Sequence, residues 1–150
     1  MKSEPETFSI DDLAHAPRQT TAWDGVRNYQ ARNLLRDEIK VGDGVLFYHS
    51  NADPPAVAGT AEVVRAGYPD ASQFDPKDDH HDPGASPDQP RWYGVDIRFS
   101  ERFARPVTLP AMRELPALRE MVLLRKGSRL SVQPVSAAEW KTIVGLGTAR

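Results

Sequence analysis

The chain has 150 residues, close to the usual size of one domain, which is long enough to bury a hydrophobic core without covalent cross-links. It contains no cysteine, so disulfides and thiolate metal sites are excluded, and its apolar runs are far shorter than the ~18 residues that span a bilayer. We therefore expect a single soluble, cytoplasmic domain over residues 1–150, most simply a monomer, with no cofactor.

The net charge of −2 is divided unevenly along the chain. Residues 1–90 hold 8 basic and 16 acidic side chains, whereas residues 91–150 hold 11 basic and 5 acidic ones, and most of these basic residues are arginines. Arginine binds phosphates and stacks on bases, so a nucleic-acid surface is one interpretation. A well-solvated surface explains the same pattern, and composition alone favours it.

The first 44 residues predict two helices. Residues 9–12 (SIDD) fit a capping start for a short helix that carries Leu13 and ends before Pro17. A second helix should begin near Asn28 and run to about Ile39, because apolar residues recur there at helical spacing. A turn at residues 42–44 (GDG) should then lead into a strand.

The middle of the chain predicts three strands. Residues 45–50 should form a central strand that is apolar on both faces and ends in polar side chains, and residues 57–65 should form the next, with a bulge or a close backbone approach at Gly59. Residues 93–100 alternate strictly, with Tyr93, Val95, Ile97 and Phe99 facing the core.

The last 43 residues predict a helix near residues 108–115, a polar-faced strand at residues 129–135 and a final helix that opens with a capping box at residues 136–139 (SAAE). Strands dominate and no βαβ rhythm appears. This pattern favours an α+β fold, a small mixed β-barrel flanked by short helices.

Residues 69–90 hold five Pro, six Asp and one Lys, and we expect them to form a long acidic, proline-rich loop with little to bury. Such a loop is either a binding edge or a tolerated insertion. The DDHHD run at residues 78–82 resembles a metal site only in composition, because adjacent ligands on a loop rarely converge on one ion. We expect no metal there.

Four short stretches concentrate aromatic, amide, hydroxyl and imidazole groups: KSEP at residues 2–5, WDGVRNYQARN at residues 23–33, FYHS at residues 47–50 and SVQP at residues 131–134. A flipped base needs a ring to stack on, groups that bind its edge, and cations for the phosphates. Trp23, Tyr29 and Tyr48 are candidate stacking rings, although packing in the core explains each of them equally well. The candidates for reading a base edge are Asn28, Ser50, Ser131 and Gln133, and those for phosphates are Lys2, Arg27, Arg32 and Arg129.

These four stretches resemble the EVE domain family, which belongs to the PUA-like superfamily of small β-barrels, from Met1 to about Leu146. The resemblance implies a non-catalytic reader of a modified base, such as 5-methylcytosine in DNA or a modified base in RNA, by base flipping. It implies a base pocket built from Lys2, Ser3, Trp23, Tyr29, Tyr48, His49, Ser50, Ser131 and Gln133. We expect Val26 and Asn28 in the same pocket, and Arg27, Arg32 and Arg129 on the phosphates. The family also carries an apolar lead-in before the KSEP stretch, so we expect a short first strand or a true start upstream of Met1.

Two other classes remain open. A small nuclease or nucleotide hydrolase would use His49 or Asp24 as a general base, although no recognisable catalytic motif is present and Asp24 reads more simply as a turn residue. His49 and Ser50 cannot pair with each other, because neighbouring strand side chains point to opposite faces. A protein-interaction module would use the acidic loop instead.

Overall fold

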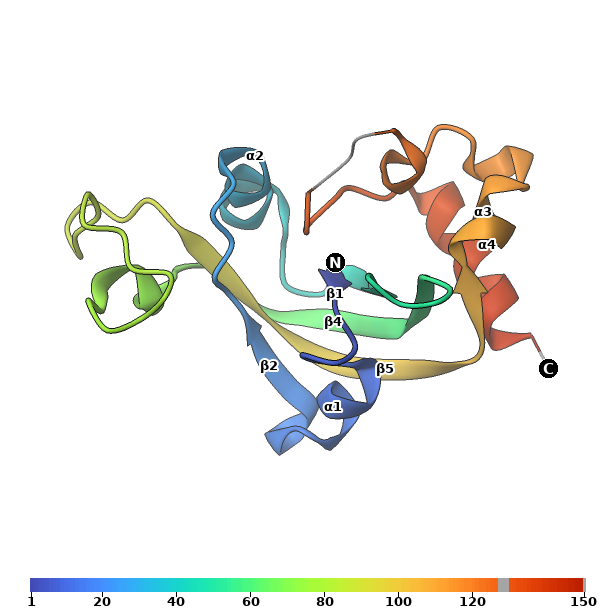
Figure 1. The fold of residues 1–150 in the computed structure, drawn as a ribbon, viewed down its shortest axis with the longest axis horizontal. Coiled ribbons are helices and arrows are strands. Elements are labelled where there is room, and N and C mark those ends of the chain that lie inside the picture. Colours follow the sequence, from blue (N-terminus) through green and yellow to red (C-terminus); the bar gives the residue numbers. More distant parts are fainter. Residues whose placement is uncertain (127–129, 150) are drawn as a thin grey trace.

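Five strands form one mixed sheet in the computed structural model, which describes residues 1–126 and 130–149 (Figure 1). The strands are β1 (Lys2–Ser3), β2 (Thr20–Trp23), β3 (Gly44–His49), β4 (Ala56–Pro69) and β5 (Tyr93–Thr108), in the spatial order β1-β3-β4-β5-β2. β1 runs parallel to β3, and the other neighbours are antiparallel. The α+β class is confirmed. The sheet ladders run from β1 to β2 without joining these two in the described part of the chain, so a closed barrel stays a prediction.

β3 separates two hydrophobic cores, as its apolar pattern predicts. Val45 and Phe47 belong to a core that includes Ile10, Leu35 and Ile97, and we call this core 1. Leu46 and Tyr48 face the opposite way into core 2, which β5 and the C-terminal helices complete. A central strand buried on both faces thus positions polar groups only where it ends, at His49 and Ser50.

β4 and β5 are long strands, and irregular pairing bends them. The register shifts at four places between them, one of which lies at Gly59. A Cβ atom at Gly59 would collide with the Glu101 carbonyl oxygen on β5, so the close backbone approach predicted for this glycine is confirmed. The alternation of residues 93–100 is also confirmed, because Val95 and Ile97 are fully buried in core 1.

The helices lie at the positions that their capping sequences predict. α1 (Ile10–His15) and α4 (Ala137–Thr148) both start with a complete capping box. α2 (Tyr29–Asn33) begins after the Asn28 cap and continues as a π-helical turn, η2 (Leu34–Glu38). α3 (Leu109–Arg113) follows β5 and lies with α4 at one end of the sheet, where both pack on core 2 (Figure 1).

The loop between β4 and β5 is more ordered than its composition predicts. A short 3-10 turn, η3 (Ala71–Phe74), opens it, and Asp70 and Gln73 are buried although we expected little burial there. The Gln73 side chain bonds to the backbone of Asp70, Arg91 and Trp92. These bonds fix both ends of the loop to each other.

The strand predicted at residues 129–135 is wrong for the part that the structure describes, since residues 130–135 form bends and extended backbone without a ladder. Their side chains do alternate, with Leu130 and Val132 turned toward core 1. A hydrogen bond from the Lys2 amide to the Ser131 carbonyl, at 2.8 Å, ties this segment to β1. Pro134 carries no N–H to continue a ladder.

Candidate nucleic-acid interface

Three of the four polar stretches meet at β1. The backbone of β1 pairs Lys2 with Tyr48 and Ser3 with His49, and the Ser50 amide donates to the Ser3 carbonyl at 2.9 Å. On its other edge β1 binds the segment 130–133 through Ser131. A small cavity of about 30 Å³ lies there, and the predicted residues among those that line it are Lys2, Tyr48, Ser131 and Gln133.

The three predicted stacking rings occupy three different environments. Trp23, at the end of β2, is half-buried and meets Phe47 of core 1 edge-on, with 5.9 Å between ring centroids. Tyr48 is buried in core 2, with 7% of its surface exposed. Tyr29 is 53% exposed and stacks on Trp92 at 4.9 Å. Because β3 lies between Trp23 and Tyr48, the structure does not bring these rings to one wall.

His49 and Ser3 are held by the chain between β1 and α1. The Ile10 amide donates to Nε2 of His49 at 3.0 Å, and the Ser3 hydroxyl donates to the Phe8 carbonyl at 2.6 Å. Burial lowers the pKa of His49, against the opposing effect of two aspartates of α1. The imidazole is therefore neutral at pH 7 with Nε2 unprotonated, and this nitrogen is occupied rather than available as a general base.

Asp24, the other candidate general base, has an exposed side chain in the β2–α2 connection. Partial burial of its carboxylate, together with the charge of Asp70, raises the pKa of Asp24. Val26 is buried in core 1, and the Asn28 side chain accepts the Ala31 amide as the cap of α2. In this structure Val26 and Asn28 therefore shape the connection between β2 and α2.

Arg27 is the most heavily bonded of the predicted phosphate ligands. Its guanidinium makes five hydrogen bonds, two to the His80 carbonyl and one each to the Val26 carbonyl, the Ser72 hydroxyl and the Asp70 carboxylate. These bonds use all five of its N–H groups. A phosphate would have to displace one of these partners.

Asp70 is the buried partner of Arg27, at 3.1 Å, with a fully buried side chain. It also accepts the Gly25 amide at 2.8 Å and both the amide and the hydroxyl of Ser72. Burial alone would raise the pKa of Asp70, but these hydrogen bonds outweigh it and hold the pKa below its usual value. The sequence offered no signal for this pair, since the two residues lie 43 positions apart.

Arg32, another predicted phosphate ligand, lies over the exposed Tyr29 ring at 4.9 Å and donates to the Arg91 carbonyl. Arg27 in turn lies over Trp92 at 5.2 Å. The two stacked rings, Tyr29 and Trp92, therefore each contact an arginine, and Trp92 is a member of this cluster that we did not predict. Arg129 lies outside the described residues.

Carboxylates of the acidic loop accept hydrogen bonds from other groups of the protein. Asp82 accepts the Trp92 indole N–H at 2.7 Å, and Asp78 accepts the His80 amide. Among the residues that the structure describes, no three His, Asp or Glu side chains are grouped to hold a metal ion. Within the same residues, no helix is long and apolar enough to cross a membrane.

The chain resembles proteins with known structures over nearly its whole length. The human THYN1 protein, solved in complex with DNA containing 5-methylcytosine, is 40% identical, with a TM-score of 0.92 over all of this chain and 96% of that one. A Pseudomonas putida protein is 45% identical, with a TM-score of 0.91 over 97% of this chain and 96% of that one.

A curated relative, thymocyte nuclear protein 1 of Danio rerio, is 42% identical over 97% of this chain and 70% of its own length. That name contains the word nuclear, so the cytoplasmic location expected from the sequence is not supported. The family model that matches, over residues 1–146, is that of the EVE domain. This match and these identities establish that the chain belongs to the EVE domain family, as the four polar stretches predicted.

Proposed function

We propose that this chain is a non-catalytic domain that binds DNA carrying a modified cytosine, and that it holds the modified base flipped out of the helix. The observation that carries the proposal is the likeness, over the whole chain, to the human THYN1 protein solved with DNA containing 5-methylcytosine. RNA with a modified base is the alternative ligand of the same site. The barrel typical of the PUA-like superfamily is part of the same proposal.

Trp23 is our candidate for the stacking ring. Tyr48 is buried and Tyr29 already stacks on Trp92, whereas Trp23 is half-buried at the end of a strand, so part of its ring remains accessible. Stacking on an aromatic side chain offsets about 1–3 kcal/mol of the cost of unstacking a base. Contacts with the base edge fall to the polar groups around β1, namely Lys2, Ser3, Ser131 and Gln133.

The phosphate contacts in this proposal come from the arginines near α2 and the segment that follows α3. Arg32 extends over Tyr29 at the surface, and Arg129 remains the second predicted ligand. Arg27 contributes by fixing the β2–α2 connection, because its donors are already bonded within the protein.

Binding of the purified protein to matched oligonucleotides tests the proposal. We would compare single- and double-stranded DNA and RNA, with cytosine or 5-methylcytosine at one position, at two salt concentrations. We expect a preference for the methylated DNA that persists at the higher salt, because a base contact releases fewer counterions than phosphate contacts do. Binding without any preference for the modified base would contradict the proposal.

Trp23→Ala sharpens this test. We expect it to lower the affinity for the methylated oligonucleotide by about 10- to 100-fold, the equivalent of one lost stack, and to leave weak, salt-sensitive binding intact. Trp140→Ala is the matched control, since Trp140 is also half-buried but packs on core 2. Equal losses for methylated and unmethylated DNA with Trp23→Ala would remove Trp23 from the pocket.

A further inference from the structure

Trp92 belongs to a cluster of aromatic and arginine side chains that also includes Arg27, Tyr29 and Arg32. It is the last residue of the loop between β4 and β5, and only 6% of its surface is exposed. Its indole N–H donates to Asp82 at 2.7 Å, and this bond is the main reason that the pKa of Asp82 lies below its usual value. The carboxylate is therefore charged at pH 7 and fixes the indole ring from within the loop.

The backbone of Trp92 is held as well as its side chain. The Gln73 side chain accepts the Trp92 amide at 3.0 Å and donates to the Trp92 carbonyl at 2.8 Å. The Asp70 amide donates to the same carbonyl at 2.9 Å, and both Asp70 and Gln73 are buried. These bonds set the position of Trp92 without any contribution from α2.

The exposed Tyr29 ring packs on this fixed indole. Tyr29 is the first residue of α2, is 53% exposed, and stacks on Trp92 at 4.9 Å with 27° between the ring planes. The guanidinium carbon of Arg32, on the same helix, lies 4.9 Å from the centre of the Tyr29 ring. The loop between β4 and β5 thus supports Arg32 through two aromatic rings.

Two hydrogen bonds hold the same guanidinium. Its Nε donates to the Asn33 side chain and its Nη1 donates to the Arg91 carbonyl, both at 2.8 Å. An arginine has five N–H groups, so three of them have no acceptor among residues 1–126 and 130–149, and no carboxylate of these residues forms an ion pair with Arg32. The group is therefore fixed in position and able to donate two parallel bonds to one anion.

Two neighbouring arginines do not combine these properties. All five N–H groups of Arg27 are bonded within the protein, as described above. Arg36 donates twice to the carboxylate of its neighbour Asp37. Of the three, Arg32 is the one that is both held in place and open to an anion.

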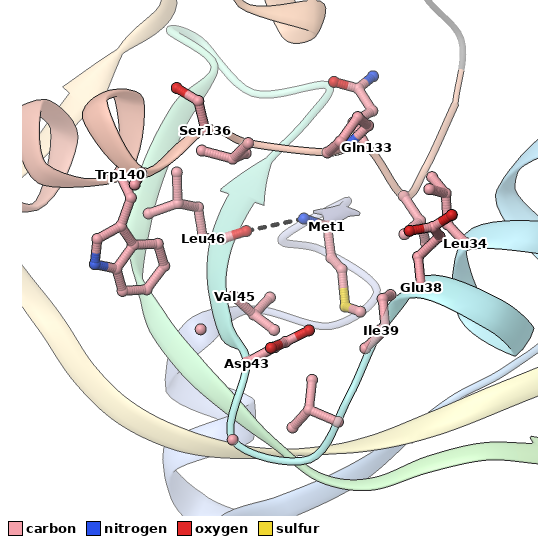
Figure 2. A pocket seen from close by; sticks show the side chains of 17 residues that line it. Met1, Leu34, Glu38, Ile39, Asp43, Val45, Leu46, Gln133, Ser136 and Trp140 are labelled. Carbon is pink, nitrogen blue, oxygen red and sulfur yellow. Dashed lines mark hydrogen bonds between the residues drawn. The ribbon is translucent and has the colours of Figure 1, made fainter.

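The helical segment that carries Arg32 also borders a cleft of about 740 Å³ beside β3 (Figure 2). η2, which continues α2, contributes Leu34 and Glu38 to the lining of that cleft, whereas Tyr29 and Arg32 do not line it and contact the loop between β4 and β5 instead. The Arg32 guanidinium therefore lies outside the cleft, beside an exposed ring, where the sugar-phosphate backbone of a nucleic acid can approach.

We propose that the loop between β4 and β5 is a positioning element of the nucleic-acid site: Trp92, through Tyr29 and together with the Arg91 carbonyl, holds Arg32 as the ligand of one backbone phosphodiester. The inference rests on the proposed function for its ligand and assigns the loop a part in it. The carboxylate of Asp82 serves this arrangement from inside the loop, which differs from the protein-interaction surface considered for the sequence.

Tyr29 gives the sharpest test, because its exposed side chain can be shortened with little effect on the fold. Tyr29→Ala should lower the affinity for methylated and unmethylated duplex DNA equally, by about three- to tenfold, and should reduce the slope of log K against log salt by about 0.9, the value for one phosphate contact. Tyr29→Phe keeps the ring and should stay within about twofold of the parent chain. A loss confined to methylated DNA would make Tyr29 a base contact and overturn the proposal.

Arg32→Ala should give at least the same loss of affinity and the same reduced slope. Adding Tyr29→Ala to it should change the affinity by less than about twofold, because the ring acts through the arginine. Arg36→Ala is the matched control, since Arg36 is bonded to Asp37, and it should keep the affinity within about twofold. Additive losses in the double variant would mean that the ring binds DNA directly, and would overturn the positioning role.

A measurement without DNA separates this proposal from the proposed function. The Arg32 Nε–H should exchange with solvent at least about fivefold faster in Tyr29→Ala and in folded Trp92→Leu than in the parent chain, and at the parent rate in Tyr29→Phe. Unchanged exchange in Tyr29→Ala would overturn the positioning role, whatever the protein binds. Faster exchange and a reduced salt slope, in a protein without preference for methylated DNA, would support the phosphate site and contradict only the base-reading function. A parent chain that binds no oligonucleotide would contradict both.

Discussion

Arg27→Ala distinguishes a structural arginine from a phosphate ligand, and the structure sets the size of the effect. The substitution leaves Asp70 with a fully buried carboxylate and without its ion-pair partner, and it removes two bonds to the His80 carbonyl. Removing one partner of a buried pair costs about 3–5 kcal/mol. The Arg27 side chain is 22% exposed, so water partly replaces it, and we expect a loss of about 2–3 kcal/mol in the free energy of unfolding.

Urea denaturation and thermal unfolding measure this loss directly. For a chain of this size, about 2–3 kcal/mol corresponds to a fall of roughly 4–12 °C in the unfolding temperature. Arg32→Ala is the matched control, since Arg32 is partly exposed and no buried carboxylate depends on it; its cost should stay below about 1 kcal/mol. A double-mutant cycle with Asp70→Asn should give a coupling energy of about 1–3 kcal/mol.

The opposite result would restore the assignment that the sequence favoured. Suppose that the free energy of unfolding of Arg27→Ala is within about 0.5 kcal/mol of that of the parent chain, and that the variant loses affinity for every oligonucleotide equally. Arg27 is then a phosphate ligand, and the reasoning from its five hydrogen bonds fails. A lower free energy of unfolding, together with an unchanged preference for methylated DNA in the folded protein, would support the structural role of Arg27.

Two further predictions concern pH and glycine. The Met1 amino group has a pKa of about 5 in the folded chain and near 8 in the unfolded chain, so the unfolded chain binds more protons between these pH values. The free energy of unfolding should therefore rise with pH from 5 to 8, by at most about 4 kcal/mol. Urea denaturation at pH 5, 6.5 and 8 measures this slope. A chain extended by Gly-Ser-Gly before Met1 should show a smaller slope, because its Met1 nitrogen is a peptide N–H; the same slope in the parent and the extended chain would assign it to other groups. Gly59→Ala should lower the free energy of unfolding by about 2–3 kcal/mol, because its Cβ would meet the Glu101 carbonyl. Gly145→Ala in α4, with nothing near its Cβ, should raise the free energy of unfolding by about 0.5–1 kcal/mol. Thermal unfolding compares the two variants, and equal effects would contradict the clash at Gly59.

Local signals in the sequence predicted much of the fold. The capping start at residues 9–12, the capping box at residues 136–139, the helix start near Asn28 and the alternation of β5 are decided by residues a few positions apart, so the sequence contains the information needed to locate them. The strand predicted at residues 129–135 failed because its polar alternation is also satisfied by an irregular segment that bonds once to β1. Composition misled us about the acidic loop, because the burial of Asp70 depends on Arg27, far away in the sequence.

The sequence predicted which backbone stretches lie together at the candidate site, but not how their side chains are arranged. The short stretches at residues 2–3, 48–50 and 131 do meet, through β1. The motif at residues 23–33 instead divides its functions, with Asn28 capping a helix and Tyr29 stacking on Trp92. Residue types alone could not separate these uses, since a capping asparagine and a base-reading asparagine offer the same amide.

The alternation of β3 limits which of the predicted residues can act on one base. Because β1 runs parallel to β3 in register, Ser3 shares the side of His49 and Phe47, and therefore the side of Trp23, whereas Lys2 shares the side of Tyr48. Ser131 and Gln133 line the cavity on the Lys2 side. A base stacked on Trp23 thus meets Ser3 and the backbone of β1 first, and Lys2, Ser131 and Gln133 can reach it only around β1. Within the proposed function, Trp23 and Ser3 therefore contact the base directly, whereas Lys2, Ser131 and Gln133 complete the contacts with its edge from the far side of β1.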